Sequence, residues 1–302
     1  MQVGTLASNG ILLAPHAERR AYLERVAASG LDHVFIADHV SFHVGTGMDG
    51  LINAATIAAS HPTLKVCVGV YLLALRHPVT VARQLATLAE SSPGQLILGV
   101  GVGGEDRNEI AMCGVDPATR GRRTDECLAV LQGLLTGEPM DYRGEFFAFE
   151  RAWIKPAPAV PIPVVVGGRA AASLARAARY GDGWLGIWST AQRYRDRVNT
   201  VNEQAAALGR APLGAHGLQL WTGIDNNRRR GRARLAKAME TMYRVPFERF
   251  ARYSPWGSAD EIAEYLAPYR DAGCRLFNIM PVAPSEEQGI EAVARIKELL
   301  QS

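Results

Sequence analysis

Residues Lys65–Leu88 read KVCVGVYLLALRHPVTVARQLATL, and this stretch decides the fold. Its first part, Lys65–Leu72, is a run of apolar and β-branched residues that predicts a buried strand. Pro78 then suits the first turn of a helix, and Val81 and Leu85 begin an apolar face with helical spacing. A strand followed at once by an amphipathic helix is the repeating unit of parallel α/β folds.

The same unit recurs along the whole chain. Seven further strands are predicted, at Val3–Ala7, His33–Ala37, Gln95–Val100, Pro163–Val166, Gly183–Ile187, Gly217–Thr222 and Arg275–Pro281. Helical periodicity follows each of them, as in Ala17–Ser29 and Glu286–Leu300. Strands and helices that alternate in this number over roughly 250–300 residues predict an α/β fold, a (β/α)8 TIM barrel. No Ser/Gly linker or charge block divides the sequence, so we expect a single domain over residues 1–302.

Two segments interrupt this alternation. Residues 140–154 (MDYRGEFFAFERAWI) predict a small hairpin that turns at Arg143-Gly144. Residues 243–257 hold five aromatic residues and two prolines between the seventh and eighth units. Loops of a barrel often cover its active site. This second insertion is therefore either a roof over the site or surface packing.

Charge and composition narrow the class of protein. The chain has 33 basic and 30 acidic residues, a net charge of +3, which argues against a protein that coats nucleic acid or a membrane surface. The arginine-rich run Arg228–Arg234 lacks interleaved aromatic residues and predicts a solvated helix start. The longest mostly apolar run, Leu64–Leu75, is too short to span a bilayer.

The expected compartment is the cytoplasm. The first residues lack the basic stretch and apolar core of a secretory signal. The cysteines are widely separated and form no Cys-x-x-Cys pair, so we expect reduced thiols in the core; they are Cys67, Cys113, Cys127 and Cys274.

Candidate catalytic residues stand where predicted strands end, because ligands bind at the carboxyl ends of barrel strands. Asp38 and His39 follow the second strand, and either could bind or protonate an organic group. His39 and His43 as metal ligands are a minor alternative. Glu105 and Glu109 follow the fourth strand, either as carboxyl groups of raised pKa that donate a proton or as a solvated first helical turn.

Glycines also collect at strand ends. Gly99, Gly101 and Gly104 match the G-x-G-x-x-G dinucleotide fingerprint, but they follow the fourth strand and no acidic residue ends a strand about twenty positions later. Gly167-Gly168-Arg169 is the stronger signal. A strand that ends in Gly-Gly and opens a helix exposes backbone N–H groups to an anion, and Arg169 adds a charge, so we predict a phosphate site there.

In the residues at these predicted strand ends, the chain resembles the bacterial luciferase-like monooxygenase superfamily, and within it the branch that uses the deazaflavin coenzyme F420. Five motifs in order carry the resemblance: GLDHVFIADHV (Gly30–Val40), VGVYLLALRHPVTVARQLATL (Val68–Leu88), LILGVGVGGEDRNE (Leu96–Glu109), PIPVVVGG (Pro161–Gly168) and AARYGDGWLG (Ala177–Gly186). The resemblance implies an oxidoreductase that moves a hydride between F420 and a small organic substrate. It also implies a homodimer.

The resemblance implies roles for particular residues. The deazaflavin ring would rest on a bulge in the third strand with a non-prolyl cis peptide at Gly69–Val70. His39 and Glu105 would be the catalytic residues. The coenzyme would be bound by Asp38, Gly69, Val70, Asn108, Gly167, Gly168 and Arg169, with its phosphate at the last three; no metal is implied.

The chain departs from the related sugar-phosphate dehydrogenases in two places. The glycine loop before Glu105 is one residue longer, and the tryptophan often found just after His39 is absent, with Ser41, Phe42 and His43 in its place. Both departures argue against a sugar phosphate as substrate, and the acid could be Glu105, Glu109 or neither. The alternatives are an FMN-dependent monooxygenase with a separate reductase, then a non-catalytic flavin-binding barrel or a metal hydrolase.

Overall fold

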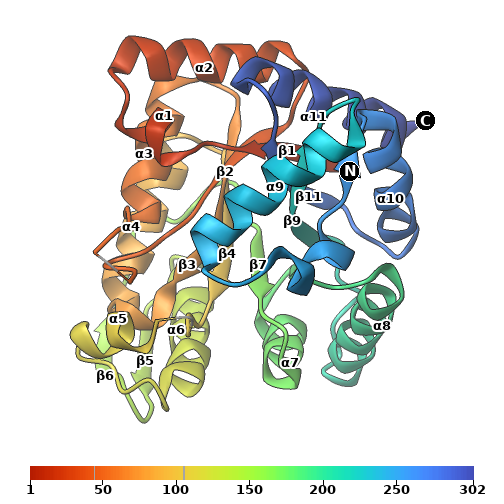
Figure 1. Cartoon of the computed structure of the whole chain (residues 1–302). Helices are drawn as coiled ribbons and strands as arrows, with labels where there is room; N and C mark the ends of the chain where they lie inside the picture. Colours follow the sequence, from red (N-terminus) through yellow and green to blue (C-terminus); the bar gives the residue numbers. More distant parts are fainter. Residues whose placement is uncertain (44, 105) are drawn as a thin grey trace. The chain divides into compact units, whose positions relative to one another are not determined.

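The computed structural model describes residues 1–43, 45–104 and 106–302, and strands alternate with helices along them (Figure 1). All eight predicted strands are present, with ends that differ by at most two residues from the predicted ones; they are β1 (Gln2–Leu6), β2 (His33–Ile36), β3 (Lys65–Leu72), β4 (Leu96–Gly101), β7 (Val164–Gly167), β8 (Gly183–Ile187), β9 (Gly217–Ile224) and β11 (Leu276–Val282). The predicted alternation is therefore confirmed. The contacts divide the chain into two compact units, Met1–Phe35 with Gly183–Ser302, and Ile36–Asp182. The single domain stays a prediction.

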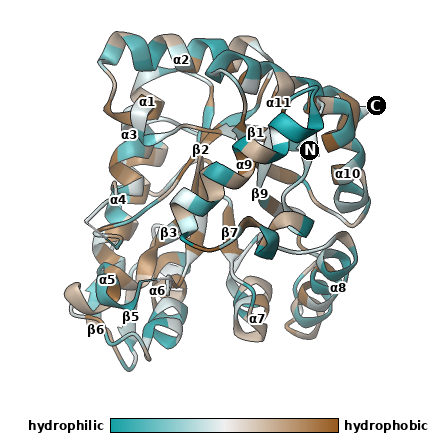
Figure 2. Ribbon diagram, viewed as in Figure 1, coloured by the Kyte–Doolittle hydropathy of each residue, from teal (hydrophilic) through white to brown (hydrophobic). Residues whose placement is uncertain are grey.

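The first unit is built on parallel strands. β1 pairs with β2 and β11, and β9 pairs with β11, with β8 and with the short strand β10 (Trp256–Gly257). Its helices are α1 (Asn9–Leu13), α2 (His16–Ala28), α8 (Ala191–Ala207), α9 (Arg228–Tyr243), α10 (Ala259–Asp271) and α11 (Glu286–Gln301). Along α2 and α8, hydrophilic and hydrophobic residues are mixed (Figure 2), because one side of each helix is buried and the other faces solvent.

The second unit holds the strands of the predicted site. β4 pairs in parallel with β3 on one side and with β7 on the other. The helices are α3 (Gly50–Ser60), α4 (Pro78–Ser91), α5 (Arg107–Met112), α6 (Arg120–Leu134) and α7 (Ala171–Tyr180), with a single 3-10 turn, η1 (Leu73–Leu75), after β3. The predicted helix after Pro78 is therefore present as α4.

The predicted hairpin is confirmed as β5 (Met140–Arg143) and β6 (Ala148–Ala152), which pair antiparallel beside α6 (Figure 1). The carboxylate of Glu126 in α6 binds the turn of this hairpin. The carboxylate of Glu126 accepts hydrogen bonds from the backbone N–H groups of Glu145, Phe146 and Phe147, at 2.5, 3.1 and 3.3 Å.

The second insertion packs on α9. It contains two 3-10 turns, η2 (Phe247–Arg249) and η3 (Ala251–Tyr253). Phe247 is fully buried against Leu235 and Met239 of α9, and Phe250 lies with its ring 5.1 Å from that of Tyr243. The insertion thus has an aromatic core of its own, and its role as a roof stays a prediction.

Two further predictions concern membrane-spanning helices and the cysteine thiols. In the described parts of the chain, none of the helices combines the length and apolar character that crossing a membrane requires. The four cysteines form no disulfide bonds with one another; three are buried and Cys113 is half-buried.

The third strand carries the predicted irregularity. The pairing of β3 with β4 changes register between Val68 and Tyr71, and the Gly69–Val70 peptide bond is cis. The cis bond that the family resemblance implied is therefore confirmed.

Glycines on the neighbouring strands make room for the side chain of Val70. A Cβ atom at Gly101 would overlap Cγ2 of Val70, and one at Gly167 would lie 3.0 Å from Cγ1. At Gly99 a Cβ atom would overlap the carbonyl oxygen of Val68. At these three positions the absence of a side chain is explained by protein packing, and the G-x-G spacing needs no dinucleotide.

We predict that Gly101→Ala lowers the free energy of unfolding by about 1–3 kcal/mol, because the new methyl group overlaps Val70 in a packed region. The double variant with Val70→Ala regains part of this loss, and urea denaturation measures both. Gly214→Ala is the matched control, since nothing lies within 4 Å of a Cβ atom there. Strictly additive effects of Gly101→Ala and Val70→Ala on the free energy of unfolding would contradict the packing contact between these two positions.

A second prediction concerns pH. His216 is buried; its Nδ1 accepts from the backbone N–H of Trp184 at 3.2 Å, and its Nε2 lies 3.3 Å from Oδ1 of Asn202. Burial lowers the pKa of His216 to about 4. The imidazole of residue 216 binds a proton at a higher pH in the unfolded chain than in the folded one. The contribution of His216 to the free energy of unfolding is therefore present at pH 7 and is lost as the pH falls through 6.5 toward 4.

The expected loss from this residue between pH 7 and pH 4 is about 3 kcal/mol of unfolding free energy. His216→Gln should flatten the dependence of stability on pH over this interval, as measured by denaturation at several pH values. The exposed His16→Gln is the control and should leave the dependence unchanged. Equal slopes for the wild type and His216→Gln would refute the prediction.

Candidate functional site

The carboxylate of Asp38, just after β2, accepts four hydrogen bonds from protein groups. Its Oδ1 accepts from the N–H of Gly50 at 2.9 Å, and its Oδ2 accepts from the N–H of Leu72 at 2.8 Å. The guanidinium group of Arg76 binds both oxygens, at 2.6 and 2.8 Å. Asp38 therefore joins the end of β2, the start of α3 and the end of β3.

This arrangement gives Asp38 a scaffolding role. The carboxyl group is 1% exposed, and burial raises the pKa of Asp38, while Arg76 and the two N–H donors oppose the rise. Arg76 also bonds to Asp49 at 3.1 Å and lies 4.4 Å from the centre of the Tyr71 ring. Since both oxygens of Asp38 are already bound by protein groups, its predicted contact with the coenzyme stays a prediction without added support.

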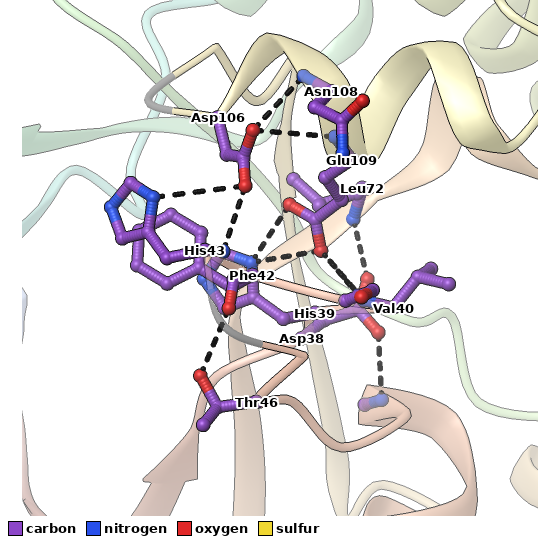
Figure 3. Close-up of polar contacts among 12 residues, drawn as sticks. Asp38, His39, Val40, Phe42, His43, Thr46, Leu72, Asp106, Asn108 and Glu109 are labelled. Carbon is purple, nitrogen blue, oxygen red and sulfur yellow. Dashed lines mark hydrogen bonds and ion pairs between the residues drawn. The ribbon is translucent and has the colours of Figure 1, made fainter.

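His39 follows directly and has one carboxylate partner. Its Nδ1 lies 3.2 and 3.1 Å from the two oxygens of Glu109 (Figure 3). Oε1 of Glu109 also accepts hydrogen bonds from the backbone N–H groups of Val40 at 2.7 Å and Ser41 at 3.0 Å. Glu109 is 2% exposed, whereas the His39 side chain is 27% exposed. Among the described residues, Nε2 of His39 makes no hydrogen bond.

A second carboxylate of α5 holds the next histidine. Asp106 caps α5 by accepting from the N–H groups of Asn108 and Glu109, and its Oδ2 accepts from the N–H of His43 at 2.7 Å (Figure 3). The hydrogen bonds of His43 and these N–H groups hold the pKa of Asp106 below its ordinary value. His39 and His43 thus contact different carboxylates.

Asn108 is another residue predicted after β4. The side-chain amide of Asn108 donates to the sulfur of Met112 at 3.5 Å, and Asn108 is exposed. Glu105, the predicted acid, lies outside the described residues. The ring centroid of Phe42 lies 4.3 Å from that of His39, so an aromatic side chain packs beside the histidine.

The Gly167–Arg169 turn has the chemistry of an anion site. Gly168 has φ of +131°, and a Cβ atom there would lie 2.7 Å from Cβ of Ser173. Within α7, no side chain caps the first turn and no acidic residue lies in it. N–H groups without intrahelical partners and the positive end of the helix dipole therefore face this turn, and they suit a phosphate.

Two functional contacts were missed at the level of sequence. The sequence analysis does not single out Arg76, because nothing local marks it as a partner of Asp38, 38 positions away. Glu109 was considered only as an acid or a solvated first turn. Glu109 stands three residues after the N-cap Asp106 and so lies at the start of α5. Only the tertiary fold brings the start of α5 to the loop after β2.

The luciferase-like monooxygenase family matches residues 1–224. This chain belongs to the luciferase-like monooxygenase family. It is similar, at 32% identity over 223 residues, to an uncharacterized protein of Mycobacterium tuberculosis, with 70% of this chain and 76% of that protein covered. It is also similar to an F420-dependent glucose-6-phosphate dehydrogenase of Nakamurella multipartita, at 32% identity over 162 residues, which cover 52% of this chain and 48% of that enzyme.

The fold is shared with a solved structure described as an F420-dependent secondary alcohol dehydrogenase in complex with an F420–acetone adduct. The TM-score is 0.86 at 18% identity, and 100% of both chains is covered. The predicted (β/α)8 TIM barrel, the family and its oxidoreductase character are therefore confirmed.

We predict that Asp38→Asn lowers the free energy of unfolding by about 3–5 kcal/mol, because it leaves the Arg76 charge without its buried partner. Asp49→Asn is the matched control; its side chain is 37% exposed, asparagine still caps α3, and the expected loss is below about 1 kcal/mol. Thermal and urea denaturation of the protein without coenzyme measure both. Similar small losses for the two variants would contradict the scaffolding role.

Proposed function

We propose that the chain is an F420-dependent oxidoreductase that moves a hydride between the deazaflavin and the hydroxyl- or carbonyl-bearing carbon of a small organic substrate. The observation that carries the proposal is the His39–Glu109 pair after β2, in which a buried carboxylate binds Nδ1 and leaves Nε2 for a substrate. The named relatives that use F420 are dehydrogenases, which supports this class of reaction. When bound, the deazaflavin supplies the acceptor or donor of a hydride.

The residues of the chain have separate tasks in this proposal. Gly69 and Val70 would support the ring, and the N–H groups at Gly167, Gly168 and the start of α7 would bind the phosphate together with Arg169. Asn108 would lie near the coenzyme. His39 would exchange a proton with the substrate oxygen, and Glu105 would be the acid near the ring.

The second candidate is an FMN-dependent monooxygenase that receives reduced flavin from a separate reductase. The match to the luciferase-like monooxygenase family favours it, because that family description names the monooxygenase reaction. Both candidates use a phosphate-bearing cofactor, so the anion site at α7 does not discriminate between them.

We predict that the purified full chain binds oxidised F420 with micromolar or tighter affinity and binds FMN at least about tenfold more weakly, a difference of about 1.4 kcal/mol. Fluorescence titration with each cofactor measures the two constants. Tight binding of FMN with no binding of F420 would replace the proposed function by the monooxygenase. Binding of neither would leave both without support.

Ala172→Glu tests the location of the phosphate. Ala172 is exposed in the first turn of α7, where a carboxylate favours the helix but repels an anion. Because two like charges about 4 Å apart near a protein surface interact by about 1–4 kcal/mol, we expect at least about tenfold weaker binding. Ala17→Glu in the first turn of α2 is the control and should leave affinity unchanged. Unchanged affinity in Ala172→Glu would exclude this turn as the phosphate site.

We also propose a cytoplasmic homodimer, as the sequence predicts; light scattering of the purified chain measures its mass against 32.7 kDa for one copy.

A further inference from the structure

Glu109 is a buried carboxylate to which the proposed function has not yet assigned a task of its own. It is the third residue of the short helix α5, and only 2% of it is exposed. Two backbone N–H groups, of Val40 and Ser41, donate hydrogen bonds to it, and Nδ1 of His39 lies within hydrogen-bond distance of both of its oxygens. An ionised carboxylate is an acceptor only, so it fits a position at which every neighbour is a donor.

These contacts argue against Glu109 as the proton donor to a substrate. Both of its oxygens face protein groups, and His39 lies at the more exposed end of the pair, at 27% against 3% for the glutamate side chain. A group that must exchange a proton with a substrate has to reach it. In this pair only the imidazole is placed to do so.

We propose that Glu109 is a positioning residue that holds His39 as the Nδ1–H tautomer. Because a carboxylate cannot donate, the proton of the neutral imidazole must lie on Nδ1, and the lone pair then lies on Nε2. The bonds to Val40 and Ser41 fix the backbone that carries His39, so one carboxylate sets both the place and the tautomer of the ring.

The consequence for the reaction rests on the proposed function. As an alcohol is oxidised, its O–H bond breaks and the proton passes to Nε2 of His39. When bound, the coenzyme would supply the acceptor for the hydrogen and both bonding electrons that the carbon gives up as the C=O bond forms. The imidazolium keeps its Nδ1–H bond to Glu109, whose negative charge stabilises it, and the reverse steps apply to reduction of a carbonyl group.

Glu109→Gln tests the tautomer directly. The side-chain oxygen of glutamine can still accept from Val40 and Ser41, but its NH2 group faces Nδ1 as a donor. The imidazole must then accept at Nδ1 and carry its proton on Nε2. Selective ¹⁵N-histidine labelling and long-range ¹H–¹⁵N spectra distinguish the two tautomers, and the seven histidines are assigned by comparison with His39→Gln.

Two further variants control this measurement. Asp106→Asn changes the other carboxylate of α5 that contacts a histidine, and asparagine still caps the helix, so the signals of His39 should keep the Nδ1–H pattern. Glu109→Asp keeps a carboxylate and should keep the Nδ1–H tautomer, and it serves as the test if Glu109→Gln does not fold.

In turnover, Glu109→Gln should lower kcat by about 10²–10⁴-fold while KM changes by less than about threefold, because the lone pair that receives the proton is lost while the pocket is kept. The Nε2–H tautomer in the wild type, an unchanged tautomer in Glu109→Gln, or an unchanged kcat after a change of tautomer would each overturn the proposal. A wild type that shows the Nδ1–H tautomer but no turnover with F420 and any alcohol would refute the proposed function and retain Glu109 as the group that orients His39.

Discussion

The ion pair between Asp38 and Arg76 is the interaction on which the candidate site depends. A buried charge is costly unless its partners are near and well oriented. Here the carboxylate is bound by a bidentate guanidinium group and two backbone N–H groups, so its burial is compensated. Because these partners come from the end of β3 and the start of α3, the residue next to His39 fixes the ends of two other elements. The position of His39 follows from this scaffold.

A second layer of the site consists of backbone and apolar contacts. The register change in β3 places the side chain of Val70 over β4 and β7, at positions where these strands carry glycine. α5 then contributes two carboxylates that bind the segment after His39, one buried and one at the surface. The polar chemistry of the site is thus carried by a few side chains on short, well-anchored segments.

Much of this was predictable from sequence. The strands were predicted because each is a short, mostly apolar run followed by a helical pattern, and both signals are local properties of the chain. His39 and the Gly-Gly turn were found because they stand at strand ends. The pairing of His39 with Glu109 was not predictable, since the two residues are 70 positions apart and only the tertiary fold joins them. The protein donors around Asp38 were not predictable either, because a sequence does not reveal how many donors the fold brings to a carboxylate.

The fit between Val70 and its glycine neighbours also restricts how such a protein can diverge. Position 70 needs empty space above two adjacent strands, and a side chain at 101 or 167 would take that space. A lineage that acquires a larger residue at either position must first, or at the same time, reduce the one at 70. Substitutions at positions 70, 101 and 167 are therefore coupled. Single substitutions at these positions would underestimate how well the region accepts several substitutions made together.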